Sequence, residues 1–347
     1  STDANGASDA ADVPTCESTT TKGADEYDQS QVNEHVFTFG HVGADNCGHD
    51  IAGEVLSELI SQKSDGKMRI DVYDSGQLGT DASMRADCAS GAIDFYSGVS
   101  SQFQSNVPQA AVFDMPFFYD NWEELMEIYS AEDLFNTFSD YCYDAGFKMM
   151  PWQAIGWREV STKVGITGPD SFKHMRMRIP TIDTYIAIWN AVGANTTAIN
   201  SSELFLALQQ GMVDGQENPY DQIYTYGFSE VQKYITNSHH IQYLQQVAMS
   251  RASWESLTET EQQIMWDAGI EMAQYVTEWS QGVQEYYLNL LQQEGVTYID
   301  FDGIDGMRDT LREMTFEPVY KAISTVTGGD TEFLDQYIKW RGYEPPT

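Results

Sequence analysis

The chain has 347 residues, of which 18 are basic and 53 acidic, so that its net charge is −35. A surface this acidic repels nucleic acids and anionic membranes, and both are excluded as partners. The charge is typical of a secreted or surface protein, or of one from a salty environment, and does not choose between them. The length predicts two domains of ordinary size. With 41% apolar and 13% aromatic residues, the chain has enough apolar side chains to form their cores.

The first 35 residues differ in composition from the rest. They are mostly Ser, Thr, Asp, Ala and Gly, with eight acids and a single lysine, Lys22. Such a segment buries too little surface to offset its ordering entropy, so residues 1–35 are predicted to be a flexible acidic leader. The leader is either the tether of a lipid-anchored surface protein or a plain disordered terminus. No apolar run of 18 residues follows it, and no basic apolar leader precedes it, so we expect an already processed chain.

Four cysteines, Cys16, Cys47, Cys88 and Cys142, allow three disulfide connectivities. None forms a CxxC pair, which argues against a zinc ribbon or a thioredoxin-type site. Cys88 lies on an apolar helical face and is interpreted as a buried small hydrophobic residue. A pairing of Cys16 with Cys47 would attach the leader to the body of the protein.

Alternating strands and helices predict an α/β fold built from two successive units. Period-2 and period-3.6 patterns set the elements of the first unit: strands at 35–42, 68–73 and 92–98, and helices at 49–62 and 81–90. A long helix at 122–145 and a strand at 147–160 follow. The pattern then starts again: strands at 175–180 and 194–199, and helices at 182–192 and 201–210. Each unit is expected to form a largely parallel sheet covered by helices.

The last third of the chain returns toward the first unit. Residues 233–250 are predicted to cross back as extended chain. Thr258 and Glu261 then form a capping box that opens a helix to about Gln293, roughly 35 residues or about 50 Å long, which is enough to span both units. The predicted domains are a first lobe of 36–153 and 243–281, a second lobe of 154–242 and 282–328, and a C-terminal tail, 329–347. Ligands of such sheets bind between the lobes, beyond the carboxyl ends of the strands.

Two arginines near predicted strand ends are the first candidates for a binding site. Arg158 lies in GWRE and Arg178 in MRMRIP. A guanidinium is permanently charged and matches a carboxylate with two parallel hydrogen bonds, so both residues are predicted to bind an anionic ligand. The alternative is that either pairs with one of the many acids. Arg176, farther from the strand end, is interpreted as structural.

Aromatic residues gather near the same loops and are expected to contribute to the pocket wall, since ligand sites are mostly apolar with few polar groups. The members assigned to the pocket are Phe95, Phe117, Trp152, Trp157 and Tyr220. Each of them alone is more often a core residue than a pocket residue.

Enzyme and metal motifs are weak. The chain has no G-x-S-x-G, no glycine-rich phosphate loop and no H-E-x-x-H. His239 and His240 are adjacent in extended chain and would face opposite sides, and His41, Cys47 and His49 lack a fourth zinc donor. The acids of YIDFDGIDG lack the Glu that ends a calcium loop. We therefore expect a protein that is not an enzyme and has no cofactor or metal.

A family resemblance rests on seven segments in order and spacing. They are SGQLGTDASM, SGAIDFYSG, QAAVFDMPFFY, GWREVSTK, FKHMRMRIP, SELFLALQQGMVDGQENPYDQI and EVQKYITNSHH. From about residue 36 to 325 the chain resembles the substrate-binding proteins of TRAP (tripartite ATP-independent periplasmic) transporters of the dicarboxylate-binding type. The resemblance implies a type II periplasmic-binding-protein fold, with two lobes that close on a carboxylate and a long helix that spans both.

The same resemblance implies residue roles. The main carboxylate-binding arginine of the family corresponds to Arg178, a second to Arg158, and the asparagine of the Gln-Glu-Asn-Pro motif to Asn218. Sialic-acid-binding members carry an Arg and a Glu where this chain has Val99 and Gln102, so that ligand is not expected. Glu217, beside Asn218, is expected to turn away from the anion toward a structural partner.

The functional expectation is an extracytoplasmic protein, periplasmic or lipid-anchored at the cell surface, that passes a small organic carboxylate to the TRAP membrane permease subunits and acts as a monomer. The alternatives are a protein that presents the ligand to a sensor, and an enzyme that reuses the fold.

Overall fold

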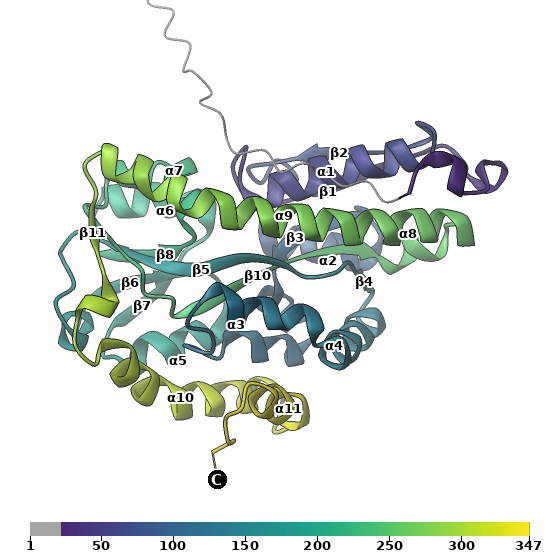
Figure 1. Ribbon diagram of the computed structural model, residues 1–347. Coiled ribbons are helices and arrows are strands. Elements are labelled where there is room, and N and C mark those ends of the chain that lie inside the picture. Colours follow the sequence, from purple (N-terminus) through teal and green to yellow (C-terminus); the bar gives the residue numbers. More distant parts are fainter. Residues whose placement is uncertain (1–21, 347) are drawn as a thin grey trace, which may run out of the picture.

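One mixed β-sheet runs through the protein, with helices on both of its faces (Figure 1). The computed structural model describes residues 22–346, and the eleven strands within them follow the order β2-β1-β3-β10-β5-β8-β6-β7, with β4, β9 and β11 off this path. The strands are β1 (His35–Gly40), β2 (Met68–Tyr73), β3 (Phe95–Val99), β4 (Phe147–Met149), β5 (Gln153–Thr162), β6 (Arg176–Ile179), β7 (Asn195–Ala198), β8 (Gly215–Asn218), β9 (Tyr234–Thr236), β10 (Ile241–Ser250) and β11 (Thr297–Ile299). The helices are α1 (Gly48–Lys63), α2 (Asp81–Ser90), α3 (Trp122–Met126), α4 (Glu132–Asp144), α5 (Asp183–Ala191), α6 (Ser201–Gln209), α7 (Tyr220–Thr225), α8 (Arg251–Glu255), α9 (Glu259–Gln293), α10 (Met307–Val326) and α11 (Glu332–Trp340).

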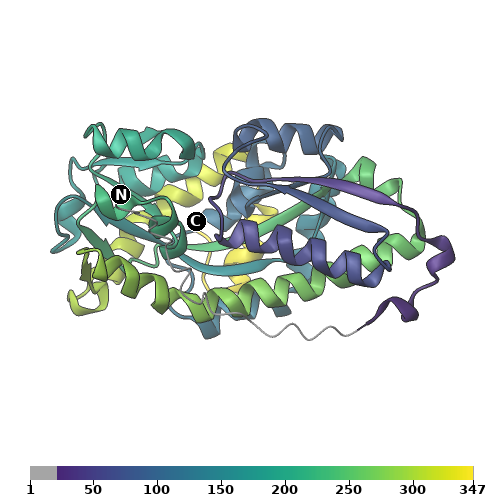
Figure 2. The same ribbon diagram turned by 90° about the horizontal axis from the view of Figure 1, so that it is seen from above.

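The sheet divides into two lobes that share two long strands. Strands β1 to β4 lie in the first lobe, and β6 to β9 with β11 in the second. Between them, β10 pairs antiparallel with β3 and β5, and β5 pairs antiparallel with β8. Every residue of β5 and β10 is buried, so these strands are core for both lobes. Figure 2 shows the lobes side by side.

The long helix α9 is the third connection. It begins at Glu259 after the predicted capping box, in which the Thr258 hydroxyl accepts from the Glu261 N–H and the Glu261 carboxylate accepts from the Thr258 N–H. It packs against α1 of the first lobe, β5 between the lobes and α7 of the second (Figure 2). The α/β fold with a helix spanning both lobes is thus confirmed, whereas the residue boundaries of the lobes stay a prediction.

The elements of the first unit match their predicted positions, but the single helix expected at 122–145 is wrong. The chain forms α3, a 3₁₀ turn (Glu127–Ser130) and then α4. The break brings the Tyr129 hydroxyl to Thr277 of α9 and to the backbone N–H of Ala154, 3.0 Å away, at the start of β5. The strand expected at 147–160 is likewise divided around Pro151, which has no N–H to donate to a neighbouring strand.

Part of the expected flexible leader is packed. Within the described residues, Tyr27 and Val32 are buried, and the Lys22 ammonium and the Tyr27 hydroxyl both bind Asp267 of α9, at 2.7 and 2.9 Å. The overall composition of the segment predicted too little buried surface for folding, but these two side chains are enough to pack it against the body of the protein. The flexible-leader expectation therefore does not hold for residues 22–34.

The C-terminal segment is also folded. Helix α11 buries Tyr337, whose hydroxyl lies 3.0 Å from that of Tyr119, and Arg341 donates through Nε and Nη2 to the Phe118 carbonyl. The tail assigned to 329–347 thus contains a helix, and its residues bind Phe118 and Tyr119 in the segment that precedes α3.

Three cysteines, Cys47, Cys88 and Cys142, are buried and free in the structure. The fourth, Cys16, lies outside the described residues, as does any pairing that involves it. Cys88 is fully buried, as its interpretation as a small hydrophobic residue requires. Within 22–346, no helix is long and apolar enough to cross a membrane.

The start of α9 gives a stability prediction. Thr258 accepts from the Glu261 N–H and donates to the Gln31 carbonyl at 2.8 Å, so Thr258→Ala removes both the cap and a link to the N-terminal segment. We expect a loss of ~1–2 kcal/mol in the free energy of unfolding, measured by urea denaturation. Thr258→Ser keeps the hydroxyl and should stay close to the wild type; equal losses in both variants would contradict the capping role.

Candidate ligand cleft

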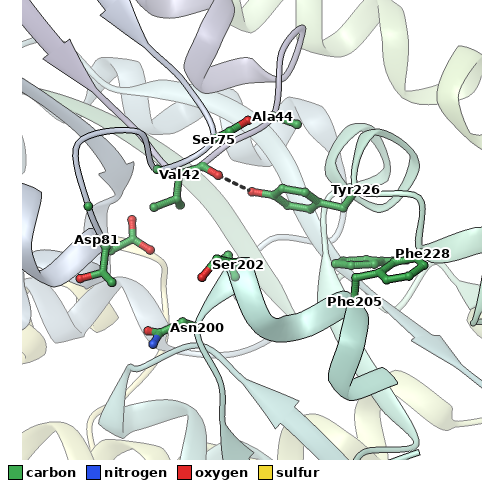
Figure 3. A pocket seen from close by; sticks show the side chains of 13 residues that line it. Val42, Ala44, Ser75, Asp81, Asn200, Ser202, Phe205, Tyr226 and Phe228 are labelled. Carbon is green, nitrogen blue, oxygen red and sulfur yellow. Dashed lines mark hydrogen bonds between the residues drawn. The ribbon is translucent and has the colours of Figure 1, made fainter. Parts of the chain in front are cut away.

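Two adjoining cavities lie between the lobes. The larger, here called the chamber, has a volume of about 540 Å³ (Figure 3). The smaller, here called the arginine cavity, has about 20 Å³, room for about one water molecule. The chamber is lined by Val42, Ala44, Ser75, Gly76, Gly79, Thr80, Asp81, Asn200, Ser201, Ser202, Phe205, Tyr226 and Phe228. The arginine cavity is lined by Val42, His49, Asp81, Val99, Gln102, Arg158, Arg178, Pro180, Ile182, Ser201, Asn218, Gln222, Tyr226 and Tyr243.

Arg178 reaches the arginine cavity from the carboxyl end of β6. It is the next-to-last residue of that strand, which ends at Ile179 and is followed by Pro180. It is 2% exposed, and its Nε and Nη2 both donate to the Ile199 carbonyl just beyond β7, at 2.9 and 2.7 Å. Burial lowers the pKa of Arg178 to about 10, which leaves the guanidinium charged at neutral pH.

Arg178 is distinguished by the partner it lacks. Seven of the chain's nine arginines have a carboxylate within 4.0 Å. Arg85, outside both cavities, is held by Asn106 and Ser105. Among the described residues, Arg178 has only a carbonyl as acceptor. A buried cation without an anion is unfavourable, and a ligand carboxylate would supply the missing charge.

Arg158, by contrast, is already paired. From β5 its Nε binds the Glu217 carboxylate, and its Nη2 reaches Glu217 Oε1 at 3.1 Å and Asn218 Oδ1 at 2.9 Å. Burial acts to lower the pKa of Arg158, but the Glu217 carboxylate outweighs it and raises the pKa. Glu217 thus turns to a structural partner, as expected, and that partner is Arg158. Arg158 lines the cavity with its charge neutralised.

Asn218 is fixed from two sides. Its Oδ1 accepts from Arg158, and its Nδ2 donates to Gln216 Oε1 at 2.5 Å.

The turn before β8 is held by Arg176, which binds Asp214 through Nε at 2.9 Å and the Gly211 carbonyl at 2.8 Å. Arg176 is therefore structural, as interpreted from the sequence, and the amides of the motif are oriented before any ligand arrives.

Asp81 lies in the wall common to both cavities, at the first position of α2. In Figure 3 its carboxylate points into the space between the lobes. The Tyr96 hydroxyl donates to its Oδ1 at 2.9 Å, and burial raises the pKa of Asp81. Across the same wall the Tyr226 hydroxyl donates to the Val42 carbonyl at 3.1 Å and so joins the two lobes.

The five aromatic residues assigned to the pocket lie outside both cavities. Phe95 packs with Phe37 and Phe39, and Trp152 with Phe113, Phe135 and Phe138. Trp157 stacks on His239, and Phe117 lines another small cavity together with Trp189 and His240. Tyr220 is buried in a hydrophobic cluster with Leu208, Ile223 and Trp279. Their place in the site stays a prediction that this geometry does not support, because their rings are used in core packing.

The aromatic part of the cleft wall comes instead from residues that sequence reasoning passed over: Phe205, Tyr226, Phe228 and Tyr243. Tyr226 and Phe228 flank Gly227, whose φ of 69° makes the sharp bend after α7 that turns both rings toward the chamber. The sequence Tyr-Gly-Phe soon after the Gln-Glu-Asn-Pro motif was the available indication.

The histidines are used structurally. His49 lies 2.8 Å from the Ser97 hydroxyl and 2.7 Å from that of Tyr243. His239 and His240, in the segment between β9 and β10, lie beside different carboxylates: His239 is 3.2 Å from Glu159, and His240 is 3.4 Å from Glu217. Across residues 22–346, no group of three His, Cys, Asp or Glu side chains is arranged to hold a metal ion.

A buried carboxyl links the lobes beside the site. Asp114 ends the 3₁₀ helix Pro108–Asp114 and accepts from the Thr184 hydroxyl of α5. Burial raises the pKa of Asp114 to about 7, against the hydrogen bond from Thr184, which lowers it.

This carboxyl predicts a pH dependence. The folded protein keeps a proton on Asp114 that the unfolded chain releases near pH 4, so the free energy of unfolding should fall as pH rises from about 4 to about 7. Asp114→Asn should reduce the slope by up to ~1.4 kcal/mol per pH unit in denaturation series. The same change at exposed Asp144 is the control; an unchanged slope in Asp114→Asn would refute the assignment.

Comparisons with known proteins identify the family of this chain. The model of the family "Bacterial extracellular solute-binding protein, family 7" matches residues 39–324. The match covers most of the chain, which therefore belongs to this family. It is an extracytoplasmic solute-binding protein of the TRAP type, in a family of non-enzymatic proteins.

Similar proteins include a solute-binding protein of Roseobacter denitrificans, 26% identical over 274 residues that cover 78% of this chain and 83% of the relative. A TRAP periplasmic solute-binding protein of Desulfovibrio salexigens with bound orotic acid superposes with a TM-score of 0.84 at 24% identity, covering 89% of this chain and 98% of the other. A sugar acid binding protein of Advenella mimigardefordensis in complex with galactonate gives 0.83 at 24% identity, covering 90% and 99%.

Proposed function

We propose that this protein captures a small organic carboxylate on Arg178 and delivers it to the membrane permease of a TRAP transporter. The observation that carries the proposal is the buried, charged guanidinium without a carboxylate partner, in a chain with 53 acids to choose from. The orotic acid and galactonate bound by the two similar structures are both carboxylates, which supports this ligand class.

The neighbours of Arg178 are proposed to orient the ligand. Asn218 already spends Oδ1 on Arg158 and one N–H on Gln216, which leaves its second N–H for a ligand oxygen. Arg158 is assigned to hold Asn218 and to contact the ligand with its remaining N–H groups. Because Glu217 balances the charge of Arg158, Arg158 contributes to binding mainly by holding Asn218 in place.

Lobe movement is required for entry. An arginine cavity of about 20 Å³ is too small for an organic acid, so the lobes must separate and close again around the ligand. Opening breaks bonds between the lobes, such as Tyr226–Val42 and the bond from the Gly48 N–H to Asp221 Oδ2 at 3.2 Å. Strands β5 and β10 and helix α9, which belong to both lobes, form the hinge. A monomeric state and a lipid anchor remain predictions from the sequence.

The first test removes the proposed anion partner. A thermal-shift screen with organic acids identifies a ligand, and calorimetry then measures its affinity for Arg178→Met. We expect affinity to fall ~100-fold or more, because a buried charge-assisted pair is lost. Arg69→Met, at an exposed arginine of β2 that lies outside both cavities, is the matched control and should retain affinity within ~3-fold. Wild-type affinity in Arg178→Met would exclude the proposal.

A second test changes the charge beside the site. Asn218→Asp keeps the acceptor for Arg158 but places a carboxylate next to the bound anion, so we expect ~10-fold or greater weakening by calorimetry. Asn195→Asp makes the same change at an exposed site on β7 and should have little effect. Equal affinities in the wild type and Asn218→Asp would remove Asn218 from the binding site.

A further inference from the structure

The charges that face the two cavities come in unequal numbers. Arg178 contributes one unbalanced positive charge, whereas Arg158 and Glu217 cancel. Burial lowers the pKa of His49 to about 3, so its ring is neutral. The remaining charged group is Asp81, which stands in the wall common to the arginine cavity and the chamber. A ligand held by Arg178 therefore extends past a carboxylate into the chamber.

The rest of the chamber wall is uncharged. Asn200 and Ser202 present an amide and a hydroxyl group, and Phe205 and Phe228 lie together on the opposite side (Figure 3). Thr80 also lines the chamber. Hydroxyls and amides exchange hydrogen bonds with ligand hydroxyls, and aromatic faces pack against the C–H surface of a carbon chain or ring. At about 540 Å³ the chamber is in the size range of ligand pockets.

A second ligand carboxylate would meet no cation in this wall. Within a closed cleft, two carboxylates near each other repel strongly, because the low local dielectric reduces screening. A ligand hydroxyl, in contrast, can donate to Asp81, whose Oδ1 already accepts from Tyr96 but whose carboxylate has further acceptor sites. Asp81 thus favours a donor and opposes an anion at the same place.

We infer that the ligand is a hydroxylated monocarboxylate: its carboxylate binds Arg178, its uncharged polyhydroxy end occupies the chamber, and Asp81 accepts from a hydroxyl and excludes dicarboxylates. This inference rests on the carboxylate capture proposed above and specifies its ligand class. It assigns Asp81 as a specificity-determining residue.

The test uses acids that differ at one end. Galactonate and galactarate, and gluconate and glucarate, share their hydroxyl pattern, and in each pair the second acid has a carboxylate where the first has a CH₂OH group. For the wild type at pH 7 and 0.15 M salt, calorimetry should show at least one hexonate binding ~10-fold or more tightly than its hexarate. Asp81→Asn, which keeps size and shape, should bring the two within ~3-fold. Asp87→Asn, on α2 but outside both cavities, is the control and should preserve the wild-type ratio.

Several outcomes overturn the inference. They are equal binding of hexonate and hexarate by the wild type, an unchanged ratio in Asp81→Asn, and tighter binding of succinate than of every hexonate. Failure of all hexonates while another acid binds through Arg178 overturns it too. In each case Arg178→Met tells the two levels apart: loss of binding in that variant keeps carboxylate capture and removes only the ligand class, whereas retained binding removes carboxylate capture itself.

Discussion

The buried ion pair between Arg158 and Glu217 is the interaction on which the geometry of the cleft depends. It joins β5, the strand shared by both lobes, to β8, which carries the Gln-Glu-Asn-Pro motif. Removing two charges from water is costly, and their mutual attraction repays that cost only with close geometry and additional hydrogen bonds. Asn218 and the Glu217 backbone carbonyl provide those bonds. The pair is thus better understood as positioning the motif than as stabilising the fold.

Because that pair is neutral, the electrostatics of the cleft reduce to Arg178 and Asp81. This matters in a chain of net charge −35, whose long-range field opposes the approach of any anion. Salt shortens the range of that field to about 8 Å at physiological ionic strength, whereas a buried pair is screened much less. Attraction therefore acts only when the ligand is already between the lobes. Selectivity must come from contacts made on closure, not from steering at a distance.

The sequence was informative where local patterns determine the outcome. The period of apolar residues placed β1, α1, β2 and α2, and the Thr258–Glu261 box placed the start of α9. Two features of the site depend instead on which strands become neighbours: Arg158 is paired with Glu217, and Arg178 has no carboxylate partner among the described residues. Two residues 20 apart looked alike as strand-end arginines. They differ because Arg158 of β5 lies beside the Glu217–Asn218 end of β8, whereas β6, which carries Arg178, pairs with the opposite end of β8 at Gly215. No local pattern carries that information.

The aromatic residues show the same limit from another side. Phe95 and Trp152 were credible pocket residues by position, but a chain of this size needs large rings to fill its core, and both are almost fully buried among other aromatic rings. The break between α3 and α4 arose from a tertiary contact as well, since Tyr129 leaves the helical path to reach α9 and β5.

The charge balance of the cleft explains the composition of the stretch DGQENP. It supplies two acids, Asp214 and Glu217, which Arg176 and Arg158 neutralise. Otherwise it offers amides, at a place where every further charge would alter the balance between Arg178 and Asp81. Val99 and Gln102 continue this neutrality on the facing wall of the arginine cavity. With no second unpaired cation in its wall, the cleft can compensate one ligand charge and no more. The neutral residues of the wall and the carboxylate of Asp81 therefore act together to limit the number of carboxylates that a ligand carries.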